Sequence, residues 1–232
     1  MKPLNFKRYA LILVLALFTG FTTRAAEDEY SKKINKEYET NDQTHLDLTN
    51  KYGDVEITNW TKNSLVIDVN ITVDHRSEEK AKELLEHITV NFDQSGNTIE
   101  VETDIDDSFN KSGWFFNFDS DNKKFSIDYK IKMPKSLQLT LENKYGDVFI
   151  DEVTGQADIT VKYGNLKANK ILRNNTKPLS QIYLAYSDGT LEEANWLKLT
   201  LKYSKMEVDK STALIAVTKY SKLYTDETSS IV

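Results

Sequence analysis

The feature that most constrains the fold is a short phrase that returns along the chain. Each copy has alternating aliphatic residues, usually a basic residue, then a tyrosine and a small residue. The tyrosines of the six copies are Tyr52, Tyr145, Tyr163, Tyr186, Tyr203 and Tyr220. The last five are spaced by 18, 23, 17 and 17 residues. A period of about twenty residues is typical of architectures in which similar units stack on one another.

Within a copy, the apolar pattern changes phase at one fixed place. Leu139, Leu141 and Tyr145 share one parity, whereas Val148 has the other. Since a strand directs alternate side chains to opposite faces, this switch predicts a corner. The Gly-Asp, Gly-Asn, Ser-Asp and Ser-Lys pairs that follow tyrosine suit a turn. Each copy therefore predicts a strand, a corner and a shorter strand.

Units of this kind bury their apolar edges only by stacking, about 4.8 Å apart. We expect the tyrosines to point inward and to align in neighbouring rungs, as a ladder along the corner. Core packing is the expected role of this ladder, and an aromatic platform for a ligand is the alternative. The first role would make Tyr163→Ala cost about 3–5 kcal/mol, as for other large truncations in a core.

The lysines that precede these tyrosines should point outward in a single file. They are Lys144, Lys162, Lys202 and Lys219. Such a file would be a solvated face that discourages lateral sheet contacts. The alternative is a stripe that binds an anionic polymer such as an acidic polysaccharide.

The first residues predict export. Lys2, Lys7 and Arg8 precede an apolar run over 10–18, which is too short to span a bilayer comfortably. A small-x-small site follows at 23–25, so residues 1–25 are interpreted as a signal peptide, with an uncleaved anchor as the alternative. Their removal would take away four basic residues and shift the formal net charge from −6 to about −10. That charge argues against nucleic acid as a partner.

The segment between the first two copies has a pattern of its own. Residues 65–73 alternate as a strand, Ser77 is a candidate N-cap for a helix, and strands follow at 89–92, 98–103 and 125–133. We expect this strand, helix and three strands to form a small α+β lobe that caps the first rung.

The predicted organisation has five parts. They are a signal peptide over 1–25, a flexible leader over 26–43, a first β-repeat over 44–60, the inserted lobe over 61–135 and β-solenoid repeats over 136–232. The chain contains no cysteine, so burial and backbone pairing must stabilise it without disulfides.

The insert also contains an acidic and aromatic stretch from Asp104 to Asn122. A long loop without periodicity is often functional or disordered. Three interpretations stay open: a calcium site, a partner-binding aromatic loop, or a mobile loop against the lobe. No spacing here matches the twelve-residue calcium loop.

Few residues suggest chemistry. His45, His75 and His87 lack metal-ligand spacing, and no phosphate loop or nucleophile motif occurs. The corner acids Asp147 and Asp188 give way to lysines in later copies. We expect no catalytic, cofactor-binding or metal residues, and no enzyme activity. A carbohydrate-active β-helix enzyme remains the alternative from another class.

The repeats 51–55 and 144–148, both Lys-Tyr-Gly-Asp-Val, carry a family likeness. Together with the inserted strand–helix–strand ahead of Met133-Pro134, they resemble the bacterial "putative adhesin" family of exported β-strand-repeat domains, akin to auto-transporter adhesin heads. The resemblance implies a mainly β fold, a right-handed single-stranded β-helix in the cell envelope. It supplies no catalytic residues.

These observations predict a non-catalytic exported module that binds glycan or protein partners or serves a structural role. An envelope-stress accessory or sensor protein is a further possibility. The periplasm, the outer cell surface and secretion all fit, with no transmembrane span after removal of the signal peptide.

The end of the sequence carries one more expectation. Residues 229–232 read as the opening of another repeat, with no capping helix or proline. Either the native chain continues, or the open C-terminal edge pairs with another molecule and the protein self-associates.

Overall fold

The computed structural model describes residues 29–106, 125–173 and 177–232. The predicted signal peptide and most of the acidic aromatic stretch lie outside the described residues. Within the described ranges, no helix is long and apolar enough to cross a membrane.

The described residues are mainly β, with one helix. The elements are β1 (Glu29–Glu39), β2 (His45–Lys51), β3 (Val55–Asn59), β4 (Ser64–Asp74), α2 (Glu78–Glu86), β5 (Ile88–Ser95), β6 (Thr98–Ile105), β7 (Phe125–Met133), β8 (Gln138–Lys144), β9 (Val148–Val153), β10 (Ala157–Lys162), β11 (Leu166–Ile171), β12 (Ser180–Ala185), β13 (Asp188–Lys202), β14 (Lys205–Lys219) and β15 (Lys222–Thr228). The predicted strand pattern of the repeats and of the insert is confirmed.

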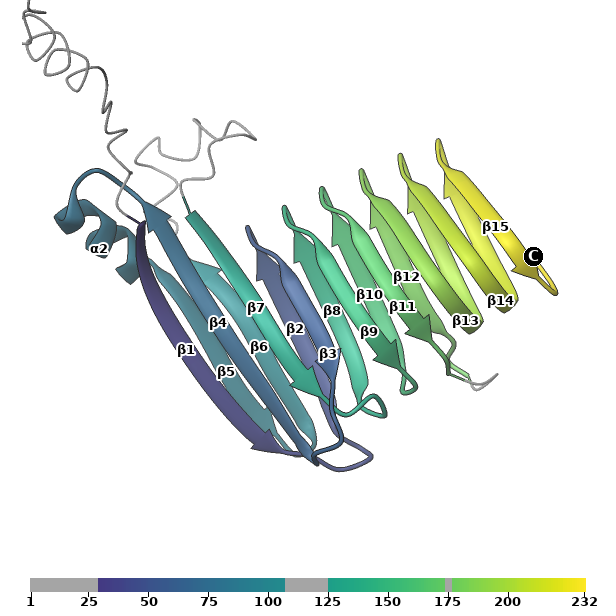
Figure 1. Cartoon of the computed structure of the whole chain (residues 1–232), viewed down its shortest axis with the longest axis horizontal. Coiled ribbons are helices and arrows are strands. Elements are labelled where there is room, and N and C mark those ends of the chain that lie inside the picture. Colours follow the sequence, from purple (N-terminus) through teal and green to yellow (C-terminus); the bar gives the residue numbers. More distant parts are fainter. Residues whose placement is uncertain (1–28, 107–124, 174–176) are drawn as a thin grey trace, which may run out of the picture.

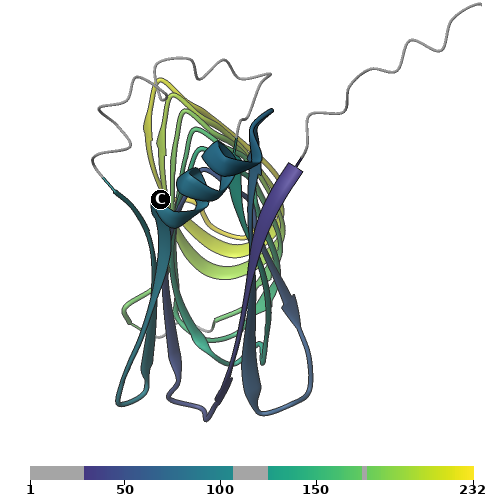
Figure 2. The ribbon, with the colours of Figure 1, turned by 90° about the vertical axis from the view of Figure 1, so that its left-hand side faces the viewer.

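These strands form one mixed sheet that is not closed. Its order is β1-β4-β7-β3-β9-β11-β13-β12-β10-β8-β2-β6-β5, with β14 on β13 and β15 on β14. Figure 1 shows the strands side by side along the long axis, and Figure 2, viewed along that row, shows them in two layers. Strand β13 belongs to both layers, because its first part pairs with β11 and its second part with β12.

The parallel register places equivalent positions of successive copies beside one another. Leu141 pairs with Ile159, Ile159 with Ile182, and Ile182 with Leu199. All four are at most 2% exposed. Each buried side chain of this kind stabilises the fold by about 1.5–3 kcal/mol. The alternation of aliphatics therefore identified the core correctly.

The inserted segment continues the same sheet at one end. β4 and β7 extend one layer next to β3, while β5 and β6 extend the other next to β2. Ser77 accepts a hydrogen bond from the backbone of Lys80 and caps α2, which contacts β1, β4 and β5. The helix thus lies across the end of the two layers (Figure 2).

The flexible leader expected over 26–43 is wrong for Glu29–Glu39, which form β1. This strand pairs antiparallel with β4 over its whole length. Tyr30, Ile34 and Tyr38 are partly buried against the core, whereas the lysines of β1 are exposed. Charged side chains on an edge strand discourage pairing with other molecules.

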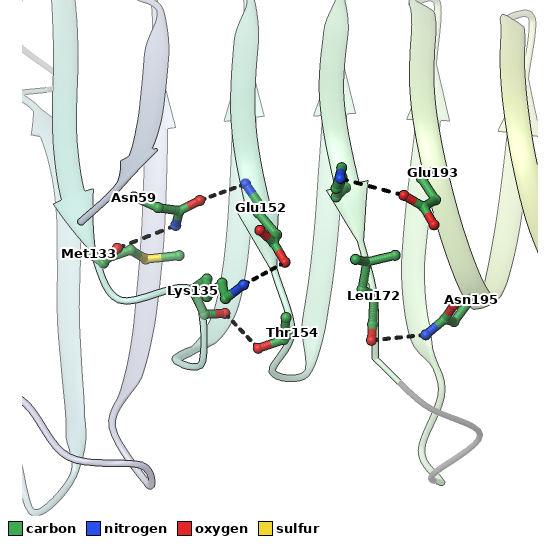
Figure 3. Close-up of polar contacts among 9 residues, drawn as sticks. Asn59, Met133, Lys135, Glu152, Thr154, Leu172, Glu193 and Asn195 are labelled. Atoms are coloured by element: carbon green, nitrogen blue, oxygen red, sulfur yellow. Dashed lines mark hydrogen bonds and ion pairs between the residues drawn. The ribbon is translucent and has the colours of Figure 1, made fainter. Parts of the chain in front are cut away.

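Polar side chains tie successive turns together at the ends remote from the tyrosines (Figure 3). Asn59 donates to the carbonyl of Met133 at 3.3 Å and accepts from the Glu152 amide at 2.8 Å. Farther along the stack, Asn195 donates to the carbonyl of Leu172 at 3.1 Å. These contacts fix the register near the ends of β3, β7, β9 and β11 and in the middle of β13.

At the other end of the stack, β15 has β14 as its one partner among the described strands. The predicted opening of another repeat is present: Ile231 forms a parallel bridge with Leu214, and the Val232 amide donates to the Leu214 carbonyl at 2.9 Å.

Buried Tyr129 should make stability fall at alkaline pH. Burial raises the pKa of its phenol to about 12, although a hydrogen bond with the Thr103 hydroxyl, at 2.6 Å, lowers it. A pKa raised above the unfolded value of about 10 contributes stability below pH 10, which is lost as the pH rises to about 12. We expect Tyr129 to account for a loss of about 2–3 kcal/mol in this window.

The measurement is urea unfolding at several pH values between 9 and about 12, on the native protein and on Tyr129→Phe. The difference between the two curves isolates this one group, because lysines and other tyrosines titrate in both. Parallel curves would contradict the assignment.

Candidate binding face

The tyrosines of the repeat adopt an uncommon backbone conformation. The described non-glycine residues with positive φ are all repeat tyrosines: Tyr52, Tyr145, Tyr163, Tyr186, Tyr203 and Tyr220, with φ from 50° to 66°. This is the left-handed region, which costs an L-residue roughly 1–2 kcal/mol. The corner is therefore centred on the tyrosine itself.

This conformation reverses the predicted direction of the rings. Tyr163, Tyr186 and Tyr203 are 47%, 53% and 46% exposed, so the inward-pointing ladder is wrong. The left-handed residue breaks the alternation of the strand and turns its side chain outward. The residue after each tyrosine points inward instead; Gly146, after Tyr145, and Ser187, after Tyr186, are both buried.

The alignment of the tyrosines in neighbouring rungs is confirmed. From Tyr52 to Tyr220, the ring centroids of neighbours lie 4.9–5.1 Å apart, with interplanar angles of 3–18°. We call this row the tyrosine ladder. Because each inner ring is covered on both faces by its neighbours, the ladder presents ring edges and hydroxyls. A ligand platform made of open ring faces does not exist along these inner rungs.

Close backbone packing holds the corners. A Cβ on Gly146 would lie 1.9 Å from the carbonyl oxygen of Gly53, and one on Gly164 would lie 2.0 Å from that of Gly146. Glycine is thus required at these two corners, where one corner approaches the next this closely. Ser187 and Ser204 take the same place in later copies, and each donates its hydroxyl to a backbone carbonyl.

Two buried asparagines complete the first corners. Asn143 donates to the carbonyls of Gly53 and Gly146 at 3.1 and 2.9 Å, and its side-chain oxygen accepts from Asn50 at 3.0 Å. Asn50 in turn donates to the carbonyls of Gly53 and Ile127. The sequence pattern did not predict this pair. Its signal was an asparagine at an inward position where later copies have Val161, Leu184 and Leu201.

Beside the ladder runs a second exposed file, which we call the corner ridge. It consists of Asp54, Asp147, Asn165, Asp188, Lys205 and Lys222. Asp54 accepts a hydrogen bond from the Asp147 amide, and Asp147 accepts one from the Asn165 amide, both at 2.8 Å. These carboxylates therefore fix the spacing of the first rungs.

A groove lies on each side of the corner ridge. One, of about 730 Å³, runs between the ridge and the tyrosine ladder from Tyr145 to Tyr203. The other, of about 780 Å³, runs between the ridge and the next outward file, in which Glu56, Phe149 and Lys167 are neighbours. Together, ladder, ridge and grooves make one elongated polar and aromatic face.

On the far side of the ladder, the predicted lysine file is present but interrupted. In register, Ala185 stands between Lys162 and Lys202. Lys162 forms an ion pair with Glu142 at 2.6 Å, and the Lys144 ammonium lies 4.8 Å from the centre of the Tyr145 ring. The file is thus broken at Ala185, and Lys162 beside this gap is neutralised by Glu142, which weakens the case for a continuous stripe that binds anions.

The histidines lie apart from this face and from one another. The His45 ring contacts the Thr140 hydroxyl at 2.9 Å, His75 contacts Ser77, and His87 lies 3.8 Å from Asp106. Across the ranges 29–106, 125–173 and 177–232, no group of three His, Asp or Glu residues is arranged to hold a metal ion.

Because its ring is exposed, Tyr163→Ala should cost about 1–2 kcal/mol, below the 3–5 kcal/mol expected for a core ring. The loss is that of stacking on two neighbours, each contact contributing about 0.5–1.5 kcal/mol, partly offset by solvent access. Chemical denaturation measures it. A loss of 3 kcal/mol or more would show that the ring is buried.

Comparisons with known proteins give no family. No family model matches the chain, and no curated protein matches it either. Among solved structures, a "putative cell adhesion protein" from Clostridium sporogenes aligns with TM-score 0.39 and 10% identity, over 87% of this chain and 98% of that one. A "putative adhesin" from Bacteroides fragilis aligns with TM-score 0.31 and 16% identity, over 87% and 97%. A "putative lipid binding protein" from Parabacteroides distasonis aligns with TM-score 0.30 and 10% identity, over 86% and 96%. Each TM-score lies below 0.5, too low to establish a shared fold or function.

Proposed function

We propose that this protein is a non-catalytic, exported module of the cell envelope that binds an elongated glycan or protein partner along the tyrosine ladder. The observation that carries the proposal is that every described copy places a tyrosine at a left-handed corner. Glycine adopts this conformation without strain, and asparagine does so with little. A turn alone would be better served by either residue, so we infer that the rings are retained for contact with a partner.

Strain of this kind marks functional positions in other proteins. Here the stacking of each ring on its neighbours offsets much of the strain, at about 0.5–1.5 kcal/mol per pair. The ladder then contributes little net stability, although it occupies six corners. Selection for stability alone does not account for that.

The geometry favours a partner with a repeating, extended backbone. Hydroxyls and ring edges return every 4.9–5.1 Å, with a groove beside them that is lined by Asp147, Asn165 and Asp188. Tyrosine contributes large contact area at low conformational cost together with a hydroxyl that forms hydrogen bonds. A polymer lying along the stack would make the same contact several times over.

We also propose the finer form of the fold, a right-handed β-helix over 136–232. Support comes from strands β8, β10 and β12 in one layer and β9, β11 and the first part of β13 in the other, each parallel to its neighbour. The apolar run and cleavage site in residues 1–25, and the likeness to exported adhesins in the Lys-Tyr-Gly-Asp-Val repeats, support export.

The assignment of a binding role without catalysis is supported by what the carboxylates of this face do. Asp54 and Asp147 accept backbone hydrogen bonds from the next rung, so their positions follow from the corner structure. An acid–base pair would instead need carboxyls that converge on a reacting atom.

The test uses residues 26–232 and a variant in which Tyr145, Tyr163 and Tyr186 are glycine. Glycine keeps the left-handed corners and removes the rings. The matched control is Tyr183→Ala, a tyrosine of β12 outside the ladder. Both variants and the parent are applied to an immobilised panel of envelope glycans and to envelope extract. We expect the parent and the control to bind and the triple variant to lose at least about tenfold in affinity.

Equal binding by the triple variant would overturn the role of the ladder. Release of new reducing or unsaturated sugar ends by the parent would overturn the non-catalytic assignment and favour a carbohydrate-active enzyme.

A further inference from the structure

The corner ridge has an uneven distribution of charge. Asp54 and Asp147 lie at one end, Lys205 and Lys222 at the other, and Asn165 and Asp188 between them. All six are exposed, and the strands that follow them are in parallel register. Five steps of about 4.8 Å make the ridge about 24 Å long.

We infer that the partner of this face is a second copy of the same chain, docked antiparallel along the corner ridge about a two-fold axis between Asn165 and Asp188. The inference rests on the proposed function, since it names a partner for the same binding face. The order of charges along the ridge supports this arrangement. When a second copy lies in the reverse direction, each acid of the ridge meets a lysine or an asparagine.

An antiparallel arrangement makes every ridge contact favourable. Asp54 then faces Lys222 of the other copy, and Asp147 faces Lys205. The side-chain amide of Asn165, which donates one hydrogen bond to Asp147 at 3.1 Å in its own chain, faces the Asp188 carboxylate with its second N–H. The two-fold symmetry repeats each of these contacts once, as in other isologous dimers. In a parallel arrangement, Asp would face Asp and Lys would face Lys, which is repulsive.

The surroundings of the ridge fit this docking. A groove lies on either side, and one of them is lined by exposed tyrosines that a second copy also presents. Lys205 forms an ion pair with Glu207 in the same chain. Both side chains of that pair are nearly half exposed, and such surface pairs are weak enough to be exchanged.

The expected dimer is weak and sensitive to salt. The ridge is about 24 Å long and one file of side chains wide, and a stable dimer buries about 800 Å² per partner, so we expect a contact centred on the ridge to be weak. Exposed charge pairs are screened when the Debye length falls from about 10 Å at 0.1 M salt to a few ångströms at 1 M.

The first test is sedimentation of residues 26–232 at several concentrations in low and high salt. We expect a monomer–dimer equilibrium that is weakened at least about tenfold by Lys205→Glu with Lys222→Glu, because acids then face acids. The matched control is Lys32→Glu with Lys33→Glu, two exposed residues of β1, which is not part of the corner ridge; it changes the net charge equally. Loss of dimer in the control alone, or in neither variant, would overturn the inference.

The second test reads the geometry directly. The chain has no cysteine, so Asn165→Cys and Asp188→Cys can be made singly and the two proteins mixed under mild oxidation. When the two proteins are mixed in equal amounts, random pairing gives as many crosslinks between positions 165 and 188 as 165–165 and 188–188 crosslinks together. Antiparallel docking predicts more 165–188 crosslinks than that sum. A random distribution of crosslinks contradicts the docking.

These results separate the inference from the proposed function. A chain that binds a glycan or an envelope protein through its ladder but stays monomeric refutes the dimer alone. Association that persists in high salt and in the lysine variant, but is lost when proline is placed in β15, assigns the contact to the open strand edge instead.

Discussion

Gly146→Ala is expected to destabilise the protein by about 3–5 kcal/mol, at the upper end of what single substitutions do. The new Cβ would lie 1.9 Å from the carbonyl oxygen of Gly53 and 2.5 Å from its carbonyl carbon. Both are backbone atoms of the neighbouring corner, so no side chain can move aside to relieve the clash. The two corners must separate, and the hydrogen bonds of Asn143 to both corners would lengthen with them.

The matched control is Gly96→Ala in the hairpin between β5 and β6. Gly96 has φ of +61°, but nothing lies within 4 Å of its Cβ position. Gly96→Ala should therefore lower the free energy of unfolding only by the backbone strain of alanine, about 1 kcal/mol. Urea denaturation of both variants gives the comparison. Equal losses would show that the corners do not approach as closely as described.

Asn143→Ala is expected to cost about 2–4 kcal/mol. The side chain is fully buried, and its removal takes a donor from the carbonyls of Gly53 and Gly146 and an acceptor from Asn50. Each buried polar group left without a partner costs about 1–3 kcal/mol, and a small cavity adds to the loss. Asn50 keeps its bonds to the carbonyls of Gly53 and Ile127 and the bond that it accepts from the Thr103 hydroxyl, which limits the effect.

The control for this variant is Asn169→Ala. Asn169 also donates its side-chain amide, to the Asp151 carboxylate at 3.1 Å, but it is only partly buried. Water can replace that bond, so its loss should cost less than about 1 kcal/mol. Thermal or chemical unfolding of the two variants side by side tests the difference, and similar losses would contradict the buried network.

Most of the strand pattern follows from the sequence because the repeat carries a strong period-two signal. Leu139 and Leu141 could be assigned to the core from alternation alone, and the start of the helix could be assigned from its cap, Ser77. Strand β1 could not, since Tyr30, Ile34 and Tyr38 recur at every fourth position and suggest no strand. What makes this segment a strand is its pairing with β4, a contact distant in sequence.

The candidate face was foreseen only in part. The spacing of the tyrosines predicted that Tyr145 and Tyr163 would be aligned, because stacked copies bring equivalent positions together. The direction of the tyrosine rings was not predicted correctly. Odd and even positions indicate the face of a side chain only while the backbone stays extended, and at these tyrosines it does not. The sequence nevertheless contained a sign of the true corner. If Asn143, Gly146 and Val148 all point inward, the first two lie three positions apart instead of two. The extra residue lies at the tyrosine, where the strand alternation must therefore break.

The sequence identifies the charged residues of the corner ridge, but it does not show that they lie beside one another on one surface. Asp147 and Asp188 appeared as acids that give way to lysines in later copies. Only the register, which places Asp188 beside Lys205 and Lys205 beside Lys222, turns that change into a gradient along one line.

Each repeat tyrosine holds a left-handed corner, and we propose that it is kept there for its exposed ring. The most direct measurement is the free energy of unfolding of Tyr163→Gly compared with Tyr163→Ala. In an ordinary strand, glycine is less stable than alanine by about 0.5–1 kcal/mol. At a φ of 57°, the order should reverse, with Tyr163→Gly more stable than Tyr163→Ala by about 1 kcal/mol. Tyr163→Ala being the more stable of the two would contradict the left-handed corner and, with it, the outward tyrosine ladder.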